Sequence, residues 1–434
     1  MIMNETLPNY TPEERRKRIW GIVGAASGNL VEWFDFYIYA VFATYFTVAL
    51  TGPAEGSKGT FFVWGAFALS FFMRPLGSWL FGWIADRYGR KQSMLISIVM
   101  MGAGSFCFAL LPTYEQVGVL APVLLLVVRL FQGLSVGGEY GAVATYMSEV
   151  ALRGRRGFYA SFQYVTLSGG QLLASLLGVI LLAFLSNEQL EQGGWRIPFF
   201  IGGFAALISL WVRRKLEETT TAEQRESKES GSLIALFRDH WKQFFLVVGY
   251  TAGGSLAFYT ITVYSRNYMM GIGVDPKVVG YIMTIGLFVF MLSQPVFGAI
   301  GDKVGRRASM LLFSAIGAVC IYPIMAWGMP TIKDSAVMLG ILLIIMMFIL
   351  SFYTSIGGLV KAEMFPTEVR ALGVGLSYAV GNALFGGTAV SVATEFKSRG
   401  HVEYFFIYVA IMLVVCFFCS FALPKKPQYL ENDH

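Results

Sequence analysis

The sequence predicts an all-α membrane protein with twelve transmembrane helices in two bundles of six. Three observations indicate this fold class. Apolar residues make up 56% of the 434 residues and charged residues only 14%, whereas soluble domains carry about 25% charged residues. Apolar segments long enough to cross a bilayer recur twelve times along the chain. A ten-residue motif recurs at a displacement of nearly half the chain length.

The first apolar segment, 19–46, follows a polar and basic stretch and is too long for the apolar core of a signal peptide. It is therefore predicted to be helix 1. The remaining eleven helices are predicted, with approximate bounds, at 61–85, 92–112, 121–149, 158–185, 197–212, 243–266, 278–300, 308–328, 336–358, 369–392 and 402–423.

Basic residues alternate between the two sets of loops that these helices define. One set, which includes both ends of the chain, holds 24 Lys and Arg residues, and the other holds 7. Because Lys and Arg collect on the cytoplasmic side, both termini are predicted to be cytoplasmic. The net charge of +6 then reflects topology and not a nucleic-acid surface. The four cysteines lie in apolar segments without metal-ligand spacing, so no metal or other cofactor is expected.

An internal repeat divides the chain into halves. The ten residues Gly82–Lys91 (GWIADRYGRK) recur, displaced by 216 positions, as Gly298–Arg307 (GAIGDKVGRR). The only long polar segment inside the chain lies between the sixth and seventh helices. Duplicated halves are typical of transporters. We therefore predict one bundle at 1–212, a cytoplasmic loop at 213–242 and a second bundle at 243–434.

The repeated motif resembles the signature loop of the major facilitator superfamily. Four further segments resemble the metabolite:H+ symporter family within it: 28–36 (GNLVEWFDF), 74–77 (RPLG), 129–139 (RLFQGLSVGGE) and 194–199 (GWRIPF). The similarity is greatest to the α-ketoglutarate carriers of that family, over nearly the whole chain. One departure is Tyr88, where those carriers have His, so no titrating His is expected at this position.

The resemblance implies a proton-coupled symporter, not an enzyme, that imports α-ketoglutarate or a related small dicarboxylate by alternating access. It also implies a monomer in the lipid bilayer of a bacterial inner membrane, with a small carboxylate and protons as partners and no nucleic acid. Three alternatives stay open: symport of another carboxylate metabolite such as itaconate, citrate, shikimate, proline or betaine; exchange in place of symport; and, from a different class, a metabolite-sensing membrane receptor.

Ionisable side chains at membrane depth are costly, so each one marks a possible functional site. Five lie well inside predicted helices, and all five belong to the first half: Glu32, Asp35, Arg74, Arg129 and Glu139. The second half is predicted to contain no buried Lys or Arg.

The carboxylates of helices 1 and 4 are the candidates for proton coupling. Glu32 and Asp35 share one face of helix 1, and Arg129 and Glu139 share one face of helix 4. A carboxylate binds and releases a proton when its cationic partner changes between states. We predict Asp35 with Arg129 as the coupling pair, Glu32 as an alternative proton site and Glu139 as a further candidate. A permanent structural ion pair is the alternative.

Arg74, about halfway along helix 2, is the candidate for carboxylate binding because its planar guanidinium suits a carboxylate bidentately. The resemblance adds that the family's substrates share a carboxylate. A structural salt bridge to helix 1 or 4 is the alternative. The second carboxylate is predicted to be bound by uncharged side chains, which could instead serve as interhelical contacts; the candidates are Tyr37, Gln163, Gln171, Tyr259, Tyr378 and Asn382.

The two repeated loops are predicted to be gates. Asp86 is placed to cap the N-terminus of a neighbouring helix, and Arg90 to pair with Glu149 when the cavity faces outward. The equivalent residues of the second half are Asp302, Arg306 and Glu363. A topological signal alone would explain the basic residues but not the Asp and Gly in register.

Overall fold

The computed structural model describes residues 10–53 and 58–430. Within these ranges it contains no strand and twelve helical segments long and apolar enough to cross a membrane. The predicted fold class is therefore confirmed. The predicted bundle limits at residues 1 and 434 lie outside the described ranges.

The first half supplies six membrane-crossing segments, the fifth of which is built from two helices. They are α1 (Pro12–Thr51), α2 (Lys58–Tyr88), α3 (Arg90–Ala109), α5 (Leu120–Val150), α6 (Arg156–Ala160) with α7 (Phe162–Phe184), and α9 (Arg196–Arg213). Short elements connect them: α4 (Tyr114–Val117), α8 (Asn187–Gln189) and the π-helical η1 (Leu190–Gly194).

A central loop, 214–240, carries α10 (Ala222–Glu226) and α11 (Leu233–Asp239) and leads into the second half. Four of the six segments there are interrupted. In chain order the elements are α12 (Trp241–Tyr259), η2 (Thr260–Tyr264), α13 (Ser265–Gly271), α14 (Pro276–Val304), α15 (Arg306–Tyr322), η3 (Pro323–Gly328), α16 (Met329–Thr331), α17 (Ala336–Thr354), α18 (Gly357–Ala362), η4 (Thr367–Val369), α19 (Arg370–Gly381), η5 (Asn382–Gly386), α20 (Ala389–Ser398) and α21 (Val402–Phe421).

Several helices run further than their apolar cores predict. The first helix begins at Pro12 and not at 19, because Thr11 and Glu14 form a capping box. The Thr11 hydroxyl oxygen accepts a hydrogen bond from the Glu14 amide, and the Glu14 carboxylate accepts one from the Thr11 amide. The tenth segment continues to Ala362, four residues beyond the predicted end. Polar residues therefore extend these helices past the apolar segments that identify them.

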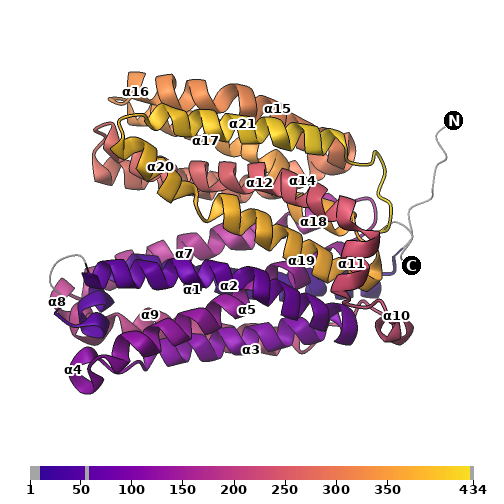
Figure 1. The fold of residues 1–434 in the computed structure, drawn as a ribbon, viewed down its shortest axis with the longest axis horizontal. Coiled ribbons are helices and arrows are strands. Elements are labelled where there is room, and N and C mark those ends of the chain that lie inside the picture. Colours follow the sequence, from indigo (N-terminus) through magenta and orange to yellow (C-terminus); the bar gives the residue numbers. More distant parts are fainter. Residues whose placement is uncertain (1–9, 54–57, 431–434) are drawn as a thin grey trace.

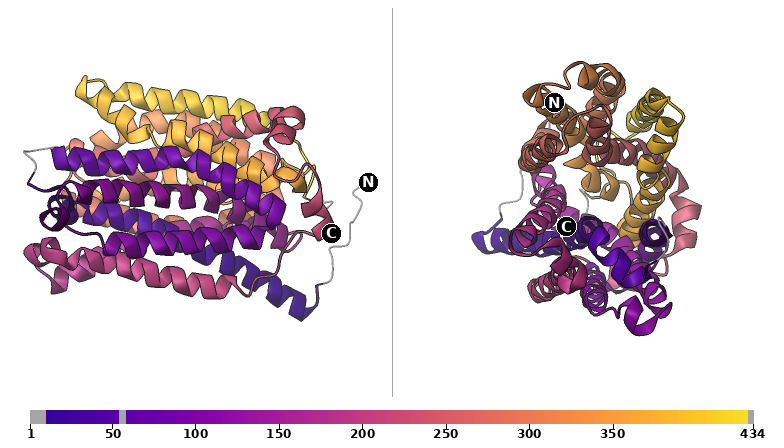
Figure 2. Two further views of the ribbon diagram at one scale, coloured as in Figure 1. Left: turned by 60° about the horizontal axis from the view of Figure 1, so that its bottom comes forward. Right: turned by 90° about the vertical axis from the view of Figure 1, so that its left-hand side faces the viewer.

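The halves form two bundles that lie side by side. In Figure 1 the helices of the first half, indigo to magenta, lie below those of the second half, orange to yellow, and Figure 2 shows the same separation in views along and across the helices. The helices α2 and α5 pack on α19, and α6 and α7 pack on α14. We call the end that holds α10 and α11 the central-loop end; α4, α8 and α16 lie at the opposite end (Figure 1).

Large apolar side chains are exposed along the outside of both bundles. Examples are Phe72, Phe184, Ile208, Val296 and Phe418, each more than half exposed. Contiguous apolar surface of this kind marks contact with a partner or a membrane. Such a surface, on helices of membrane-spanning length, is what a bundle embedded in a bilayer requires.

Two interruptions directly adjoin predicted substrate residues. The π-helical segment η2 follows Tyr259 directly, and η5 begins at Asn382. The two sites are neighbours, since α12 packs against η5. Single π-helical turns are frequent at functional sites. Both of these predicted substrate residues thus lie at a change of helix type.

Candidate functional site

Two arginines predicted to lie inside the first bundle, Arg74 and Arg129, pack against aromatic rings. The Arg74 guanidinium carbon is 4.1 Å from the ring centroid of Phe71 and 5.5 Å from that of Phe36. The Arg129 guanidinium carbon is 4.0 Å from the Tyr39 centroid. Both side chains are at least 94% buried, and neither forms an ion pair with any of the residues described. Cation–π contact thus partly replaces hydration for both charges.

Asp35 is held by neutral donors. The Ser105 hydroxyl donates to one of its oxygens, and Gln132 Nε2 donates to the other at 3.1 Å. Arg129 Nη1 donates to Gln132 Oε1 at 3.0 Å. Gln132 therefore stands between the two members of the predicted coupling pair, which make no direct ion pair in the described residues.

Glu32 has a different environment from Asp35. It is 5% exposed, and its Oε2 atom is buried without a hydrogen-bond partner in the described structure. The cations that act on it electrostatically are Arg74 and Arg213. Glu32, Arg74 and Arg129 line one cavity of about 10 Å³. A space of that size holds about one water molecule and no organic substrate.

Glu139 forms a buried ion pair with Arg213, the last residue of α9. Arg213 also donates to the backbone oxygens of Ala25 at 2.8 Å and Met94 at 2.9 Å, and Ser97 donates to Glu139 at 2.7 Å. The assignment of Arg213 to the cytoplasmic loops is therefore wrong, because its side chain turns back into the bundle. The geometry of Glu139 matches the structural ion pair that the sequence left as an alternative.

The predicted substrate residues fall into two groups. Buried polar atoms without a hydrogen-bond partner in the described residues are found on Gln163 (Nε2), Tyr259 (hydroxyl) and Asn382 (both amide atoms). The Tyr259 hydroxyl interacts electrostatically with Arg74 and Asn382 without meeting the geometry of a hydrogen bond. Polar atoms left unpaired at such depth are costly. These three residues therefore keep unused hydrogen-bonding capacity in the described structure.

The other three candidates are already engaged. Gln171 Nε2 donates to the Tyr37 hydroxyl at 2.7 Å, which joins α7 to α1. Tyr378 stacks on Tyr140 of the other half, with ring centroids 3.5 Å apart and an interplanar angle of 11°. The first contact therefore lies within the first half, and the second joins the two halves.

The second half does contain a buried cation, contrary to the sequence prediction. Lys361 is 0% exposed and lies in α18. Its ammonium donates to the Tyr140 hydroxyl at 3.2 Å, to Tyr353 at 3.4 Å and to the Gly357 carbonyl at 3.1 Å. The prediction failed because α18 continues the tenth segment beyond the apolar run, so that a residue assigned to a loop lies inside a helix.

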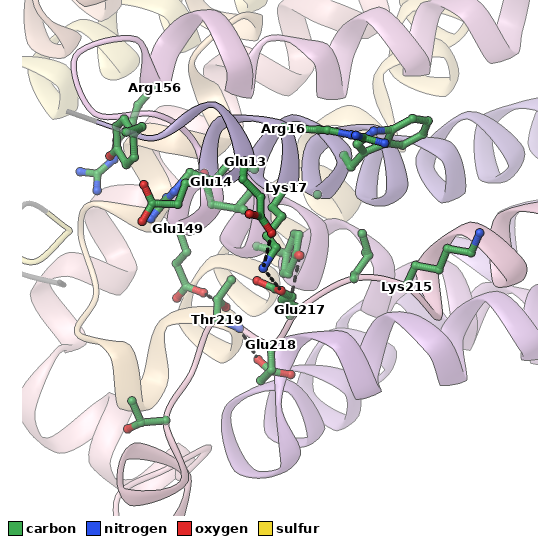
Figure 3. A pocket seen from close by; sticks show the side chains of 18 of the residues that line it. Glu13, Glu14, Arg16, Lys17, Glu149, Arg156, Lys215, Glu217, Glu218 and Thr219 are labelled. Atoms are coloured by element: carbon green, nitrogen blue, oxygen red, sulfur yellow. Dashed lines mark hydrogen bonds and ion pairs between the residues drawn. The ribbon is translucent and has the colours of Figure 1, made fainter. Parts of the chain in front are cut away.

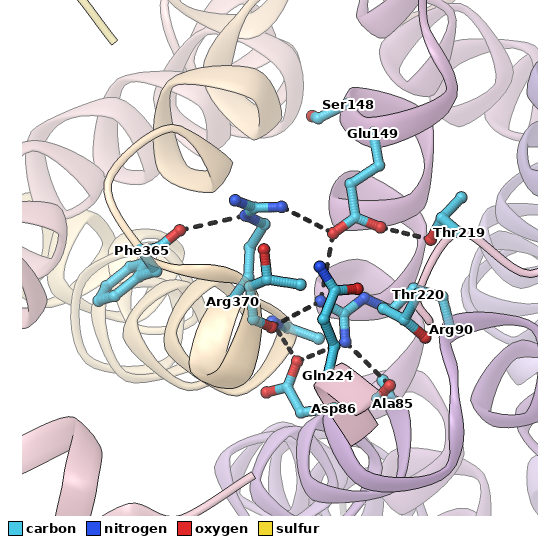
Figure 4. A network of polar contacts seen from close by, with 12 residues as sticks. Ala85, Asp86, Arg90, Ser148, Glu149, Thr219, Thr220, Gln224, Phe365 and Arg370 are labelled. Carbon is cyan, nitrogen blue, oxygen red and sulfur yellow. Dashed lines mark hydrogen bonds and ion pairs between the residues drawn. The ribbon is translucent and has the colours of Figure 1, made fainter. Parts of the chain in front are cut away.

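Residues of the first repeat form contacts between the two halves at the central-loop end (Figure 4). Asp86 accepts hydrogen bonds from the backbone amides of Ala371 and Leu372, at 3.0 and 2.9 Å, at the start of α19. Arg90 donates to Asp86 at 2.7 Å and to Glu149 at 3.2 Å. Glu149 also pairs with Arg370 of the second half at 2.9 Å.

The second repeat makes the corresponding contacts in the opposite direction. Asp302 accepts from the backbone amides of Gly157 at 2.7 Å and Phe158 at 2.9 Å, at the start of α6. Arg306 pairs with Asp302 at 2.9 Å and with Glu363 at 3.4 Å. Each half therefore caps a helix of the other half.

The first glycine of each repeat allows this approach. A Cβ on Gly82 would lie 2.6 Å from the Leu372 Cα, and a Cβ on Gly298 would collide with the Gly157 carbonyl. Only glycine lets the helix ends come close enough for the aspartate four residues later to reach them. This explains why Gly and Asp repeat together.

The central loop adds further contacts at the first repeat. Glu218 accepts from the amides of Arg90 and Lys91, both at 3.0 Å, and thereby caps α3. The Thr219 hydroxyl donates to Glu149 at 2.5 Å. Figure 3 shows these side chains at one wall of a cavity of about 1390 Å³, opposite Glu13 and Lys17 of α1. The sequence offered no motif for this loop.

Two surface features of this end take no part in these contacts. Tyr88 is 57% exposed and packs edge-on against Trp83, with centroids 5.3 Å apart. In the central loop, the hydrogen bond from Arg238 lowers the pKa of the exposed Asp239 carboxyl. That carboxyl remains ionised at neutral pH, as expected for a solvated ion pair.

Comparison with known proteins assigns the family. The model of the family described as "Sugar (and other) transporter" matches residues 21–234 and 212–428. Alpha-ketoglutarate permease of Escherichia coli (strain K12) is 52% identical over 417 residues, 96% of each chain. A citrate-proton symporter of Salmonella typhi is 31% identical over 397 residues, 89% of this chain and 90% of that one.

Solved structures support the same fold. The proton:xylose symporter XylE of the major facilitator superfamily, bound to 6-bromo-6-deoxy-D-glucose, superposes with a TM-score of 0.80 at 17% identity, over 96% of this chain and 98% of that one. The predicted resemblance is thus confirmed. The chain belongs to the sugar (and other) transporter family of the major facilitator superfamily, and it is a multi-pass transporter of a bacterial membrane, not an enzyme.

Proposed function

We propose that this transporter imports α-ketoglutarate, or a related short dicarboxylate, together with protons by alternating access. One observation carries the proposal. Arg74 is a buried cation with no ion pair in the described structure, and it interacts electrostatically with Tyr259, which also interacts with Asn382; the Tyr259 hydroxyl and the Asn382 amide lack hydrogen-bond partners among the described residues. The relative that is 52% identical is named for α-ketoglutarate, and more distant relatives are named citrate-proton symporters, which supports a carboxylate substrate.

Arg74 binds one substrate carboxylate in this proposal. Its planar fork donates two parallel hydrogen bonds, and the π-face contacts with Phe36 and Phe71 leave its edge available. The unpaired groups of Tyr259 and Asn382 belong to the second half. A substrate that contacts them would draw the two halves together.

Glu32 is the proton site that this geometry favours over Asp35. Asp35 already accepts two hydrogen bonds, whereas the Oε2 atom of Glu32 has none in the described residues. A substrate carboxylate that binds Arg74 pairs with the cation that otherwise stabilises the negative charge of Glu32. An ionised carboxylate without a partner is then costly, and a proton on Glu32 removes that cost. Competition for Arg74 thus links substrate binding to proton binding.

The central-loop end is the cytoplasmic end in this proposal, with both termini on that side, as the distribution of Lys and Arg indicates. The contacts of Asp86, Glu149 and Asp302 then describe a state closed to the cytoplasm. The two bundles move as the units 1–212 and 243–434 about the loop 213–242. We expect a monomer in the lipid bilayer to be sufficient for transport.

Charge balance limits the number of protons. Moving a dianion inward opposes a membrane potential by ~2.3 kcal/mol per charge per 100 mV. Two protons make the inward step electroneutral, and a third would let the potential assist uptake. Import by this carrier therefore requires at least two protons for each dicarboxylate when the potential is large.

Uptake by proteoliposomes of a panel of labelled carboxylates tests the proposal, with the pH gradient and the membrane potential imposed separately. We expect concentrative uptake of five-carbon dicarboxylates that depends on an inward proton gradient. Uptake that responds to neither gradient would rule out proton symport. Counterflow without proton movement would indicate exchange, and saturable binding without uptake would indicate a receptor.

A further inference from the structure

Lys361 is a buried charge that the proposed mechanism does not use. It is completely buried, and within the described structure it forms no ion pair. Its three hydrogen bonds go to neutral oxygens. Charged groups at membrane depth that lack a countercharge are rare and are functional by default. The environment of this lysine therefore requires an explanation.

Four tyrosine rings enclose the ammonium. Its nitrogen lies 5.1 Å from the ring centroid of Tyr353, 5.3 Å from Tyr378, and 5.5 Å from both Tyr140 and Tyr250. Tyr140 comes from the first half and the other three come from the second half. The Tyr250 hydroxyl is buried without a hydrogen-bond partner among the residues described. We call this set of four tyrosines the tyrosine cage.

The cage adjoins the proposed substrate site. Tyr378 contributes its ring to the cage and interacts electrostatically with Arg74 and Tyr259. Gln163, whose amide nitrogen is unpaired, lies against Gly358, three residues before Lys361. One polar region at the bundle interface thus has Arg74 of the first half on one side and Lys361 of the second half on the other.

The depths of Arg74 and of Tyr378, one ring of the cage, can be compared along their helices. Arg74 precedes Asp86 by twelve residues of α2, or ~18 Å at ~1.5 Å per residue, and Tyr378 follows the helix start that Asp86 caps by ~10 Å. Along the helix axes, Arg74 and Tyr378 are therefore offset by ~8 Å, and the Lys361 ammonium lies 5.3 Å from the Tyr378 ring centroid. The carboxyl carbons of a five-carbon dicarboxylate are ~5 Å apart, since C–C bonds are ~1.5 Å, and each carboxylate accepts from a cation at ~2.8 Å.

We propose that Lys361 binds the second carboxylate of the substrate, and that the tyrosine cage holds its ammonium when no substrate is present. This inference rests on the proposed function, since it assigns the distal carboxylate of the same substrate. When substrate binds, the Lys361 ammonium exchanges its three hydrogen bonds to neutral oxygens for hydrogen bonds to a charged carboxylate. Because Arg74 and Lys361 belong to different halves, a dicarboxylate links the bundles by two charged contacts, and a monocarboxylate by one.

The test compares glutarate with butyrate, which lacks the second carboxylate, as inhibitors of labelled α-ketoglutarate uptake into proteoliposomes. The variants are Lys361→Met, Lys361→Arg and, as a control on an exposed cation, Lys397→Met. In the wild type, glutarate should inhibit far better than butyrate. Lys361→Met should weaken glutarate by about 10- to 100-fold, the usual effect of a lost charged hydrogen bond, and should leave butyrate unchanged. Lys361→Arg should restore part of the preference.

The outcomes separate this inference from the proposed function. Failure of the wild type to transport any dicarboxylate would contradict the proposed function. Wild-type transport with an unchanged glutarate preference in Lys361→Met would overturn the role of Lys361. An equal loss for both inhibitors would show a purely structural role and would also overturn it.

A measurement on the wild type covers the case in which Lys361→Met does not fold. A small amine-acylating reagent is applied to proteoliposomes, and modification of Lys361 is measured by mass spectrometry. Glutarate should protect Lys361, and butyrate at the same concentration should not. Equal modification with both compounds, or a lysine that never reacts, would contradict a substrate-accessible site.

Discussion

Arg74 shows how a single residue can keep its charge inside a membrane and still remain available to a ligand. The rings of Phe36 and Phe71 stabilise the flat faces of its guanidinium. No carboxylate within the described ranges occupies its edge. A lysine could not use both surfaces in this way, because its ammonium is a compact point charge.

Arg74→Lys should therefore raise the KM for dicarboxylate uptake by about 10-fold or more, since one of two parallel hydrogen bonds is lost. Initial uptake rates in proteoliposomes measure it. Arg196→Lys is the matched control, because Arg196 donates to the Ala109 carbonyl at 2.7 Å, away from the proposed site. An unchanged KM in Arg74→Lys would contradict bidentate recognition.

Glu32→Gln should separate transport from the proton gradient. The neutral amide mimics the protonated carboxyl, so counterflow of substrate should persist while concentrative uptake driven by a pH gradient is lost. Asp35→Asn is the comparison, because Asp35 is already satisfied by Ser105 and Gln132. The reverse pattern, with coupling lost only in Asp35→Asn, would move the proton site to Asp35.

At the scale of helices, the repeat glycines determine how closely the halves approach. Gly298 of α14 lies against the Gly157 backbone, whereas a methyl group added to Gly280 of the same helix would meet no neighbouring element within 4 Å in the described structure. The close contact places Asp302 on the amides of Gly157 and Phe158. Helix packing and helix capping are thus coupled at this interface.

Gly298→Ala should weaken the closed state at the central-loop end by about 1–3 kcal/mol, the usual cost of overpacking. Hydrogen exchange of the α6 and α14 amides at that end should become faster. Gly280→Ala in the same helix should leave the exchange unchanged. Equal exchange in the two variants would show that the contact does not hold the gate.

The elements also show where sequence reasoning stops. The motif residues Asp86 and Asp302 could be located, because Gly and Asp recur in register. Lys361 and Arg213 could not, because a basic residue at the end of an apolar run suits a cytoplasmic loop equally well. Tertiary packing determines whether such a residue is buried. Here α18 continues the helix past Lys361, and the Arg213 side chain turns back towards Glu139. The alternation of Lys and Arg still predicts the same orientation without these two residues.

For the whole molecule, apolar content and the repeat were enough to predict twelve helices in two halves. The proposed substrate site was predictable only in part. Arg74, Gln163, Tyr259 and Asn382 come from four different segments, and the sequence does not say which polar atoms remain unpaired after packing. The central loop gave no signal, although Glu218 caps α3.

Removing one aspartate from each interface tests the gate of the whole transporter. Asp86→Asn and Asp302→Asn should each shift the protein towards a state open at the central-loop end, because each breaks an ion pair and two charged caps. Hydrogen exchange at the starts of α19 and α6, respectively, should become faster. The effects should be nearly additive in the double variant, since the interfaces are separate.

Glu229→Gln provides the control for these variants, because Glu229 forms only an exposed pair with Arg238 at 3.0 Å in the described residues. Its exchange and uptake should match the wild type. Concentrative uptake should fall in each aspartate variant and be lost in the double variant, while substrate binding persists. Full uptake by the double variant would show that these contacts do not form the gate.

The reciprocal capping has the form of an isologous interface. Asp86 of the first half meets the start of α19, and Asp302 of the second half meets the start of α6, as two identical subunits would meet across a two-fold axis. In a true dimer, one substitution would alter both contacts, and their occupancy would depend on protein concentration. Here the partners are tethered in one chain, so each contact can change alone. The two gates are free to diverge in strength while the symmetry of the motion is kept.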